Sequence, residues 1–362
     1  MRYIPYLFLF LSVACSQQKA AEEQEEIVEA VDSIAVLKPV FVTEKSDFDT
    51  DDPAFWINPA DPAQSLILGT DKGDENNENA ALMVYDLEGK IIADKCIKGL
   101  TRVNNVDICY GFSLGGETKD LAVLTERGRD MLRVFTLPDM QAVDAGGIPV
   151  FADDSLKAPM GVALYQQEGA TYAIVSRKFG LSGSYLWQYE LKEKEGKVVG
   201  EVVRKFGKFE GGKEIEAIAV DQELGYVYYS DEGKGVRKYY ADPAKGDEEL
   251  ALFATEGFTD DHEGISIYTL EDGTGYILVS DQQANQFHIF PREGTADNPH
   301  AHTLLKTIKV STNESDGSEV TSLTLNPTFE GGLFVAMSDD KTFHFYRWKD
   351  IAGDDLKVRV EK

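Results

Sequence analysis

The sequence predicts an all-β protein, a six-bladed β-propeller with four-stranded antiparallel blades. Three observations support this prediction: a three-part unit recurs six times, its segments alternate apolar and polar residues, and sustained helical periodicity is nearly absent. One four-stranded sheet per repeat of about 50 residues is the rule for propellers. A pair of β-sandwiches is the alternative, but it would not require polar residues at the same place in every unit.

Each unit has the same parts in the same order. The first part is a short alternating segment, which starts at Asp52, Asn105, Met160, Glu216, Glu263 and Thr321. The second is a strand that ends in a polar triplet, and the triplets end at Lys72, Arg127, Lys178, Glu232, Gln282 and Asp340. The third is an aromatic strand such as LMVYDLEG, followed by an outer strand such as KIIADKCIKG. Because equivalent positions of different blades form rings, we expect both sets to meet at the mouth of a central channel.

The N-terminal residues predict export. Residues 1–14 carry Arg2, an apolar run and small residues before Cys15, a pattern typical of a lipoprotein signal peptide. The run is too short to span a bilayer as a helix. We therefore expect Cys15 to be lipidated and the protein to be anchored in the bacterial cell envelope, on the periplasmic or outer side of the outer membrane, with secretion as the alternative.

Two further regions follow the signal peptide. Residues 15–38 are acidic and lack aromatic residues, which predicts a flexible tether between the lipid and the folded domain. Residues 39–362 are assigned to the propeller. We expect a monomer whose contact with the membrane is the N-terminal lipid alone.

The charge balance excludes some classes of function. Lys and Arg number 36 against 63 Asp and Glu, which gives a formal net charge of −27. Nucleic acid is not the expected partner, because binding to phosphates needs a clustered basic surface. Three cysteines and five histidines without zinc spacing make a disulfide scaffold or a histidine-built metal site unexpected.

The ring of strand-end residues is basic in three repeats and acidic or amide-bearing in the other three. The basic set can hold a phosphate or carboxylate through charge-assisted hydrogen bonds, and consists of Lys72, Arg127 and Lys178 with Arg177 and Arg102 as neighbours. The oxygen-bearing set suits a hard cation such as calcium, and consists of Glu216, Glu232, Glu263, Asp261 and Gln282 with Asp51, Asp52 and Asn105 nearby. Each residue alone could instead cap a turn or form a surface ion pair. Together they predict a site for a polyphosphate neutralised by calcium.

Five segments resemble the β-propeller phytases: DTDDPAFW, LMVYDLEGK, VNNVDICYGF, KEIEAIAVD and DDHEGISIYTLEDGTGYILVSDQ. The resemblance extends from about Asp47 to Trp348. It implies a six-bladed enzyme that binds several calcium ions and releases phosphate from myo-inositol hexakisphosphate (phytate), preferably as the calcium salt. Such an enzyme is a 3-phytase.

The resemblance also implies roles for individual residues. The family's calcium-binding motifs match Asp52 with Pro53, Asn105 with Val106, then Glu216, Glu232, Asp261, Glu263 and Gln282, and in the sixth repeat Asp316. The family's phosphate-binding cations match Lys72, Arg127 and Lys178, and the implied catalytic set adds Glu216 and Asp51. The expected mechanism is attack in line by a calcium-activated water, with the three cations stabilising the phosphoryl oxygens.

Three departures from the family affect the expected activity. Met160 stands where the family has a tyrosine, Gly73 stands where it has a second lysine, and GDENNENA is an inserted loop. A thioether cannot hydrogen-bond a phosphate as a phenol can. We expect weaker activity or an altered second phosphate subsite.

Two other functions stay open on the same fold. One is a non-catalytic, calcium-stabilised surface propeller that binds sugars or proteins, and the other is a calcium-dependent lactonase or esterase. Neither accounts for three basic residues at equivalent positions of three repeats.

Overall fold

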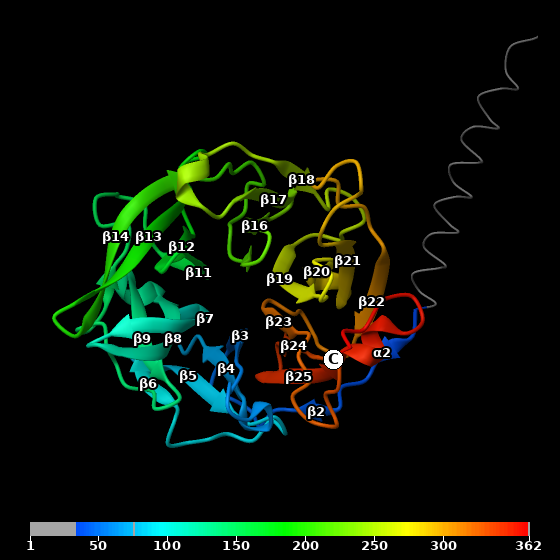
Figure 1. Ribbon diagram of the computed structural model, residues 1–362, viewed down its shortest axis with the longest axis horizontal. Helices are drawn as coiled ribbons and strands as arrows, with labels where there is room; N and C mark the ends of the chain where they lie inside the picture. The colour runs from blue at the N-terminus through cyan, green and yellow to red at the C-terminus, as the bar shows by residue number, and fades with distance from the viewer. Residues whose placement is uncertain (1–33, 75–76, 361–362) are drawn as a thin grey trace, which may run out of the picture.

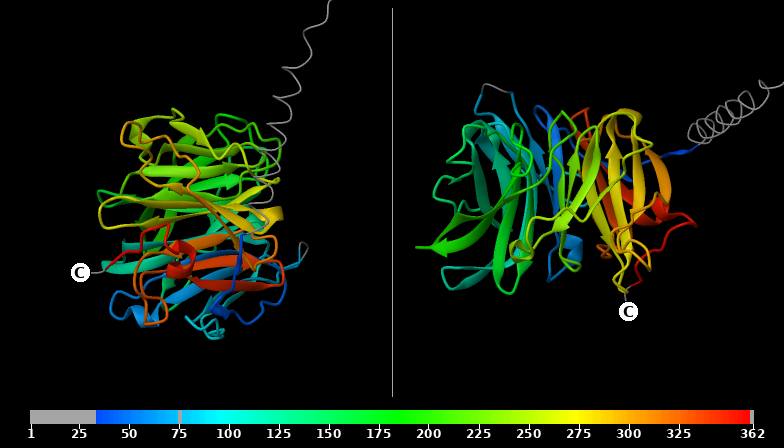
Figure 2. Two further views of the ribbon diagram at one scale, coloured as in Figure 1. Left: turned by 90° about the vertical axis from the view of Figure 1, so that its right-hand side faces the viewer. Right: turned by 90° about the horizontal axis from the view of Figure 1, so that it is seen from above.

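The protein is a ring of antiparallel sheets around a central axis (Figure 1), seen in a computed structural model that describes residues 34–74 and 77–360. These residues form six sheets, which confirms the prediction of an all-β six-bladed propeller. Side views show that the strands run between the two faces of the ring (Figure 2). No helix in the described ranges is long and apolar enough to cross a membrane. The predicted signal peptide, Cys15 and most of the tether lie outside the described residues.

Each blade places one strand near the axis and one at the rim. The innermost strands are β3 (Thr50–Trp56), β7 (Val103–Leu114), β11 (Pro159–Gln167), β15 (Ile218–Asp221), β19 (His262–Thr269) and β23 (Ser318–Thr321). The second strands are β4 (Leu66–Asp71), β8 (Glu117–Glu126), β12 (Ala170–Arg177), β16 (Tyr226–Asp231), β20 (Gly275–Asp281) and β24 (Leu333–Ser338). The third strands are β5 (Ala80–Tyr85), β9 (Met131–Leu137), β13 (Leu186–Lys194), β17 (Gly235–Tyr240), β21 (Gln286–Pro291) and β25 (Thr342–Arg347).

The outer strands complete the blades. They are β6 (Ile97–Leu100), β10 (Ile148–Pro149), β14 (Lys197–Phe206), β18 (Ala251–Phe253), β22 (Lys306–Val310) and, for the sixth blade, β2 (Phe41–Val42). Short 3-10 helices follow or join some strands: η1 (Pro62–Gln64), η2 (Arg127–Arg129), η3 (Pro243–Lys245) and η4 (Gln282–Ala284). A short α-helix, α2 (Trp348–Ala352), follows the last strand.

The N-terminal strands close the ring. β2 pairs antiparallel with β25, with Phe41 opposite Phe345, so the two ends of the described chain share the sixth blade. The Phe343 N–H donates a buried hydrogen bond of 2.9 Å to Thr43 Oγ1 at this junction. β1 (Val36–Leu37) pairs parallel with β22 and adds a fifth strand to the fifth blade, beyond the expected four. The first and last segments of the propeller therefore hold each other in place.

The hydrophobic core lies between neighbouring blades. Apolar side chains of the described residues form six clusters, one at each contact between adjacent sheets. The cluster between blades two and three, for example, contains Leu121, Val134, Val162 and Trp187. Successive residues of a strand point to opposite faces of its sheet, so each blade contributes to two clusters. This shared packing fixes the position of every blade relative to the axis.

Four inner strands begin with a β-bulge. The register shifts lie between Thr50 and Pro53, between Val103 and Val106, between Pro159 and Val162, and between His262 and Ile265. A bulge sets two residues opposite one on the partner strand and changes the direction in which side chains point. The simple alternation expected from the sequence therefore fails at this end of the inner strands.

The prediction for the sixth inner strand is wrong. The strand is β23, Ser318–Thr321, and not the segment that starts at Thr321. The true strand carries Ser318 and Glu319 and lacks apolar alternation, whereas the following segment supplies Leu323 and Leu325. These two leucines join the cluster between blades six and one, which explains their apolar pattern.

We expect Thr43→Val to lower the free energy of unfolding by about 1–3 kcal/mol, because the buried Phe343 N–H loses its acceptor while the side-chain volume is kept. Urea unfolding followed by tryptophan fluorescence measures this change. The matched control is Thr118→Val on the exposed hairpin of blade two, which should leave the unfolding midpoint unchanged. Equal midpoints for the two variants would show that the junction hydrogen bond does not stabilise the ring.

Candidate functional site

A cavity of about 290 Å³ lies where strand ends of five blades meet a loop of the sixth. Its cations come from blades one to three and its carboxylates from blades four to six. The lining residues are Lys72, Arg102, Asn104, Arg127, Met160, Lys178, Glu214, Glu216, Glu232, Asp261, Glu263, Gln282 and Asp316. We call this the mouth cavity. The regular second strands explain the positions of three cations in the cavity. Lys72 directly follows β4, Arg127 directly follows β8 and Lys178 directly follows β12.

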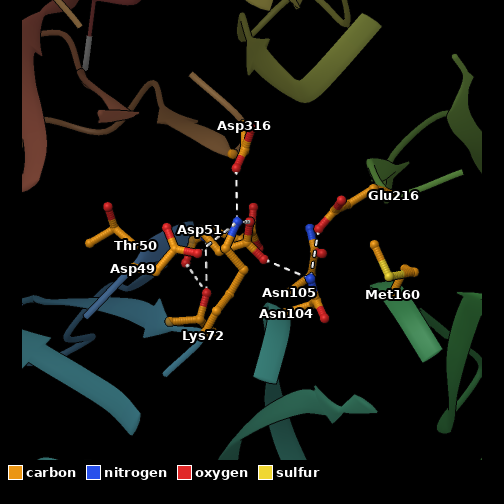
Figure 3. A network of polar contacts seen from close by, with 12 residues as sticks. Asp49, Thr50, Asp51, Lys72, Asn104, Asn105, Met160, Glu216 and Asp316 are labelled. Carbon is orange, nitrogen blue, oxygen red and sulfur yellow. Dashed lines mark hydrogen bonds and ion pairs between the residues drawn. The ribbon is translucent and has the colours of Figure 1, made fainter. Parts of the chain in front are cut away.

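Lys72 is the centre of an ion-pair network in the mouth cavity (Figure 3). Its Nζ lies 3.0 Å from Asp51 Oδ1, 3.1 Å from Asp316 Oδ2 and 3.6 Å from Asp49 Oδ2. Although burial opposes it, the charges of Asp51 and Asp316 raise the pKa of Lys72 well above its ordinary value. Lys72 therefore stays protonated and links blade one to blade six.

Asn104 extends this network to blade four (Figure 3). Its Nδ2 donates to Asp51 Oδ2 at 3.0 Å and to Glu216 Oε1 at 2.9 Å. Asn104 was not among the residues expected from the sequence, which pointed to Asn105. The bulge between Val103 and Val106 sets both asparagines near the mouth, and only knowledge of that bulge could have separated their roles.

The acids of blades four and five are buried close to one another. Burial and the neighbouring charges of Glu214 and Asp261 raise the pKa of Glu232 to about 9. Burial and Glu232 raise the pKa of Glu263 well above its ordinary value, and burial and Asp51 do the same for Glu216. These carboxylates repel one another, so the arrangement favours a proton or a bound cation between them.

Three buried oxygen atoms at this end of the propeller have no hydrogen-bond partner in the described part of the chain: Asn104 Oδ1, Asn105 Oδ1 and Glu232 Oε1. Such atoms are costly to bury unless they bind something. Within the same residues, no group of three or more His, Cys, Asp or Glu side chains converges into a formed metal site. The acids line the mouth cavity, and Lys72 and Lys178 form ion pairs with Asp316 and Glu214.

The remaining candidate cations differ in their contacts. Lys178 Nζ lies 3.0 Å from Glu214 Oε2, and Arg127 Nη1 lies 2.9 Å from Met160 Sδ. Arg177 is fully buried and does not line the mouth cavity. Its guanidinium donates to Asp154 Oδ2 and to the carbonyl oxygens of Leu156 and Ser184, so it holds together the loops around Lys178.

A second cavity, of about 220 Å³, lies along the inner strands, and we call it the channel cavity. Asp52, Pro53 and Val106 line it together with Asp107 and Glu319. Asp52 Oδ2 accepts a hydrogen bond of 3.0 Å from the Val106 N–H. The bulge in β3 thus separates consecutive acids: Asp51 belongs to the network at the mouth and Asp52 to the channel cavity.

Burial also perturbs the acids of the channel cavity. It raises the pKa of Asp107 to about 6 and that of Glu319 to about 8. Burial likewise raises the pKa of Asp52 well above its ordinary value. Asp107 and Glu319 were not expected from the sequence, because Asp107 falls inside an alternating strand segment and Glu319 lies before the segment expected to start at Thr321.

Blade six contributes to the mouth cavity through a loop and not through a strand end. Asp316 lies just before β23, and burial raises its pKa to about 7. Asp340, the strand-end residue of this repeat, pairs instead with Lys45 at the surface, at 3.7 Å. Glu214 of blade four lines the cavity as well and was not expected, because it lies two residues before the repeat segment that begins at Glu216.

Comparison with known proteins assigns the chain to a family. A family model described as phytase matches residues 6–346 of the chain. The 3-phytase of Bacillus subtilis (strain 168) is 29% identical over 325 residues, which cover 83% of this chain and 80% of that protein. A solved streptogramin B lyase structure is 13% identical, covers 85% of this chain and 87% of its own, and has a TM-score of 0.46, too weak a likeness to inform fold or function. On the match to the family model, the chain belongs to the phytase family.

Proposed function

We propose that this protein is a calcium-dependent 3-phytase, which releases phosphate from phytate by attack of water. The observation that carries the proposal is the mouth cavity, in which cations from three blades face carboxylates from the other three. Membership of the phytase family and the similarity to a 3-phytase support the same conclusion. Phytate bears a phosphate on every carbon of its ring, so a polar cavity with several cations suits it.

The residues present fit calcium. Among the described residues, the mouth cavity offers carboxylate and amide oxygens and no sulfur ligand other than the thioether of Met160, and hard divalent cations prefer oxygen. Calcium would satisfy the unpaired Glu232 Oε1 and relieve the repulsion that raises the pKa of the neighbouring acids. The proposed ligands at the mouth are Asp51, Asn105, Glu216, Glu232, Asp261, Glu263, Gln282 and Asp316, and those along the channel are Asp52, Pro53 and Val106.

The side chains of the mouth cavity have separate roles in the proposed reaction. Lys72, Arg127 and Lys178 bind the phosphoryl oxygens and stabilise the charge that develops on them. Asp51 and Asn104 position Lys72 and Glu216 through the hydrogen bonds described above. Bound calcium would neutralise the substrate and lower the pKa of a coordinated water. No histidine or cysteine lines the cavity in the described part of the chain, so a covalent phosphoenzyme is not part of the proposal.

The first test is phosphate release from calcium phytate by the purified protein. We expect activity with calcium, none after treatment with EGTA, and recovery when calcium is added back, because the acids need the cation to accept a polyanion. p-Nitrophenyl phosphate and a lactone serve as comparison substrates. Undiminished activity without calcium would contradict the metal requirement. Cleavage of the lactone without phosphate release from phytate would contradict the proposed phosphatase reaction.

The second test concerns the cations. Lys178→Ala should lower kcat/KM for phytate at least about tenfold, or roughly 1.4 kcal/mol of barrier, because a phosphoryl contact is lost. The matched control is Lys194→Ala, at the exposed end of β13, which should keep the wild-type rate. If the two variants were equally active, Lys178 would not belong to the site.

The third test uses pH. The folded protein binds protons at Glu232 and Asp316 more tightly than the unfolded chain, with pKa values of about 9 and 7 against ordinary values of 4.5 and 3.8. Without metal, we therefore expect the Tm to fall by several degrees as pH rises from 5 to about 8.5. Saturating calcium should remove most of this fall, because the cation replaces the protons. Differential scanning calorimetry in EGTA and in calcium measures both curves, and parallel curves would contradict cation binding by these acids.

A further inference from the structure

Lys213 joins two blades at the rim of the mouth cavity. It lies between β14 and β15, before the inner strand of blade four, whereas its partners come from the start of blade five. Its Nζ lies 2.6 Å from Asp260 Oδ1 and contacts Asp261 Oδ1 directly. The hydrogen bonds to both acids raise the pKa of Lys213 above its ordinary value, against the effect of desolvation. The ammonium therefore stays charged at this rim.

Asp261 is the member of this pair that lines the mouth cavity. Its Oδ1 contacts Lys213, and its Oδ2 accepts a hydrogen bond of 2.8 Å from Gln283 Nε2. Glu232 and Glu214 lie close by, and their charges interact: Glu214 and Asp261 raise the pKa of Glu232, and Lys213 lowers it. Lys213 thus partly compensates the same acids that we propose to hold calcium.

We propose that Lys213 is a tethered counter-cation that competes with calcium for the carboxylates at the blade-five rim. In the metal-free protein its ammonium occupies Asp261, and it must leave that carboxylate when a divalent cation binds. The inference rests on the proposed function, because it assigns Lys213 a role toward the same metal.

Two features make the exchange feasible. Lys213 keeps 37% of its side chain exposed, so the flexible four-carbon stem can swing the ammonium into solvent. Asp260 is 56% exposed and does not line the cavity, so it can retain the ammonium while Asp261 is released. Repulsion between an ammonium and a divalent cation makes simultaneous occupation of Asp261 unfavourable.

The exchange gives Lys213 two effects of opposite sign. Without calcium the ammonium offsets repulsion among the acids and stabilises the fold. With calcium present, the ammonium must first leave Asp261, and this displacement weakens calcium binding. A structural residue would stabilise both states alike, and a phosphate ligand would change affinity for the anion and not for the metal.

The experiment compares Lys213→Met, Lys213→Gln and Lys213→Arg with the wild-type protein. The control is Lys98→Met, which removes an exposed lysine paired with Asp47 at 2.9 Å, both outside the mouth cavity. Calcium is titrated by isothermal calorimetry, and the Tm is measured in EGTA and in saturating calcium. We expect the Met and Gln variants to bind calcium about threefold to tenfold more tightly, with a lower Tm in EGTA and a larger calcium-induced rise. The Arg variant and the control should match the wild type.

The inference is overturned if the Met and Gln variants bind calcium no more tightly than the wild type, or if their Tm falls equally in EGTA and in calcium. It is also overturned if calcium affinity is unchanged while KM for phytate rises, which would make Lys213 a substrate ligand. In these cases the wild type still binds calcium and releases phosphate. A wild-type protein that does neither would instead reject the proposed function.

Discussion

Electrostatic repulsion among buried carboxylates is the constraint on which the site depends. The propeller brings strand ends of five blades and a loop of the sixth to one opening, and there burial raises the pKa values of Glu216, Glu232 and Glu263, with the charges of neighbouring acids adding to the rise. Burying charges of one sign together is expensive unless they are paired, protonated or bound to a cation. Lys72 and Lys178 offset part of this cost by ion pairs that cross between blades. The electrostatic cost that these ion pairs leave uncompensated would favour the binding of a metal cation.

The fold can hold such a site because its stabilising contacts lie elsewhere. The apolar clusters sit between the blades, and the junction of β2 with β25 closes the ring. Neither depends on the mouth residues. The bulges at the start of four inner strands then change the direction of individual side chains without disturbing the clusters, which is how neighbouring residues such as Asp51 and Asp52 reach different cavities.

The sequence predicted the parts of the site that repeat regularly. Lys72, Arg127 and Lys178 were found because each follows a buried strand at the same place in its repeat, and these second strands are unbroken. Asn104 was missed because a bulge breaks the alternation there, and Arg177 was included although it is fully buried beneath the loops. The start of the sixth inner strand was misplaced because its polar residues lack the apolar signal that identified the other five. Local periodicity cannot show bulges or loops that cross between blades, since both depend on tertiary contacts.

The charges that line the mouth cavity affect the binding of both a polyphosphate and a cation. The described residues that line it include four cationic side chains, Lys72, Arg102, Arg127 and Lys178, and six carboxylates, a formal charge of −2 when all are ionised. A protein of net charge −27 with such a cavity repels a polyphosphate at long range. In the proposed calcium-bound state, two divalent cations would reverse the sign of the cavity, and each phosphate then bound would strengthen the hold on the cations. Because such coupling is reciprocal, the proposed function implies that a calcium salt is a better substrate for this cavity than the free anion.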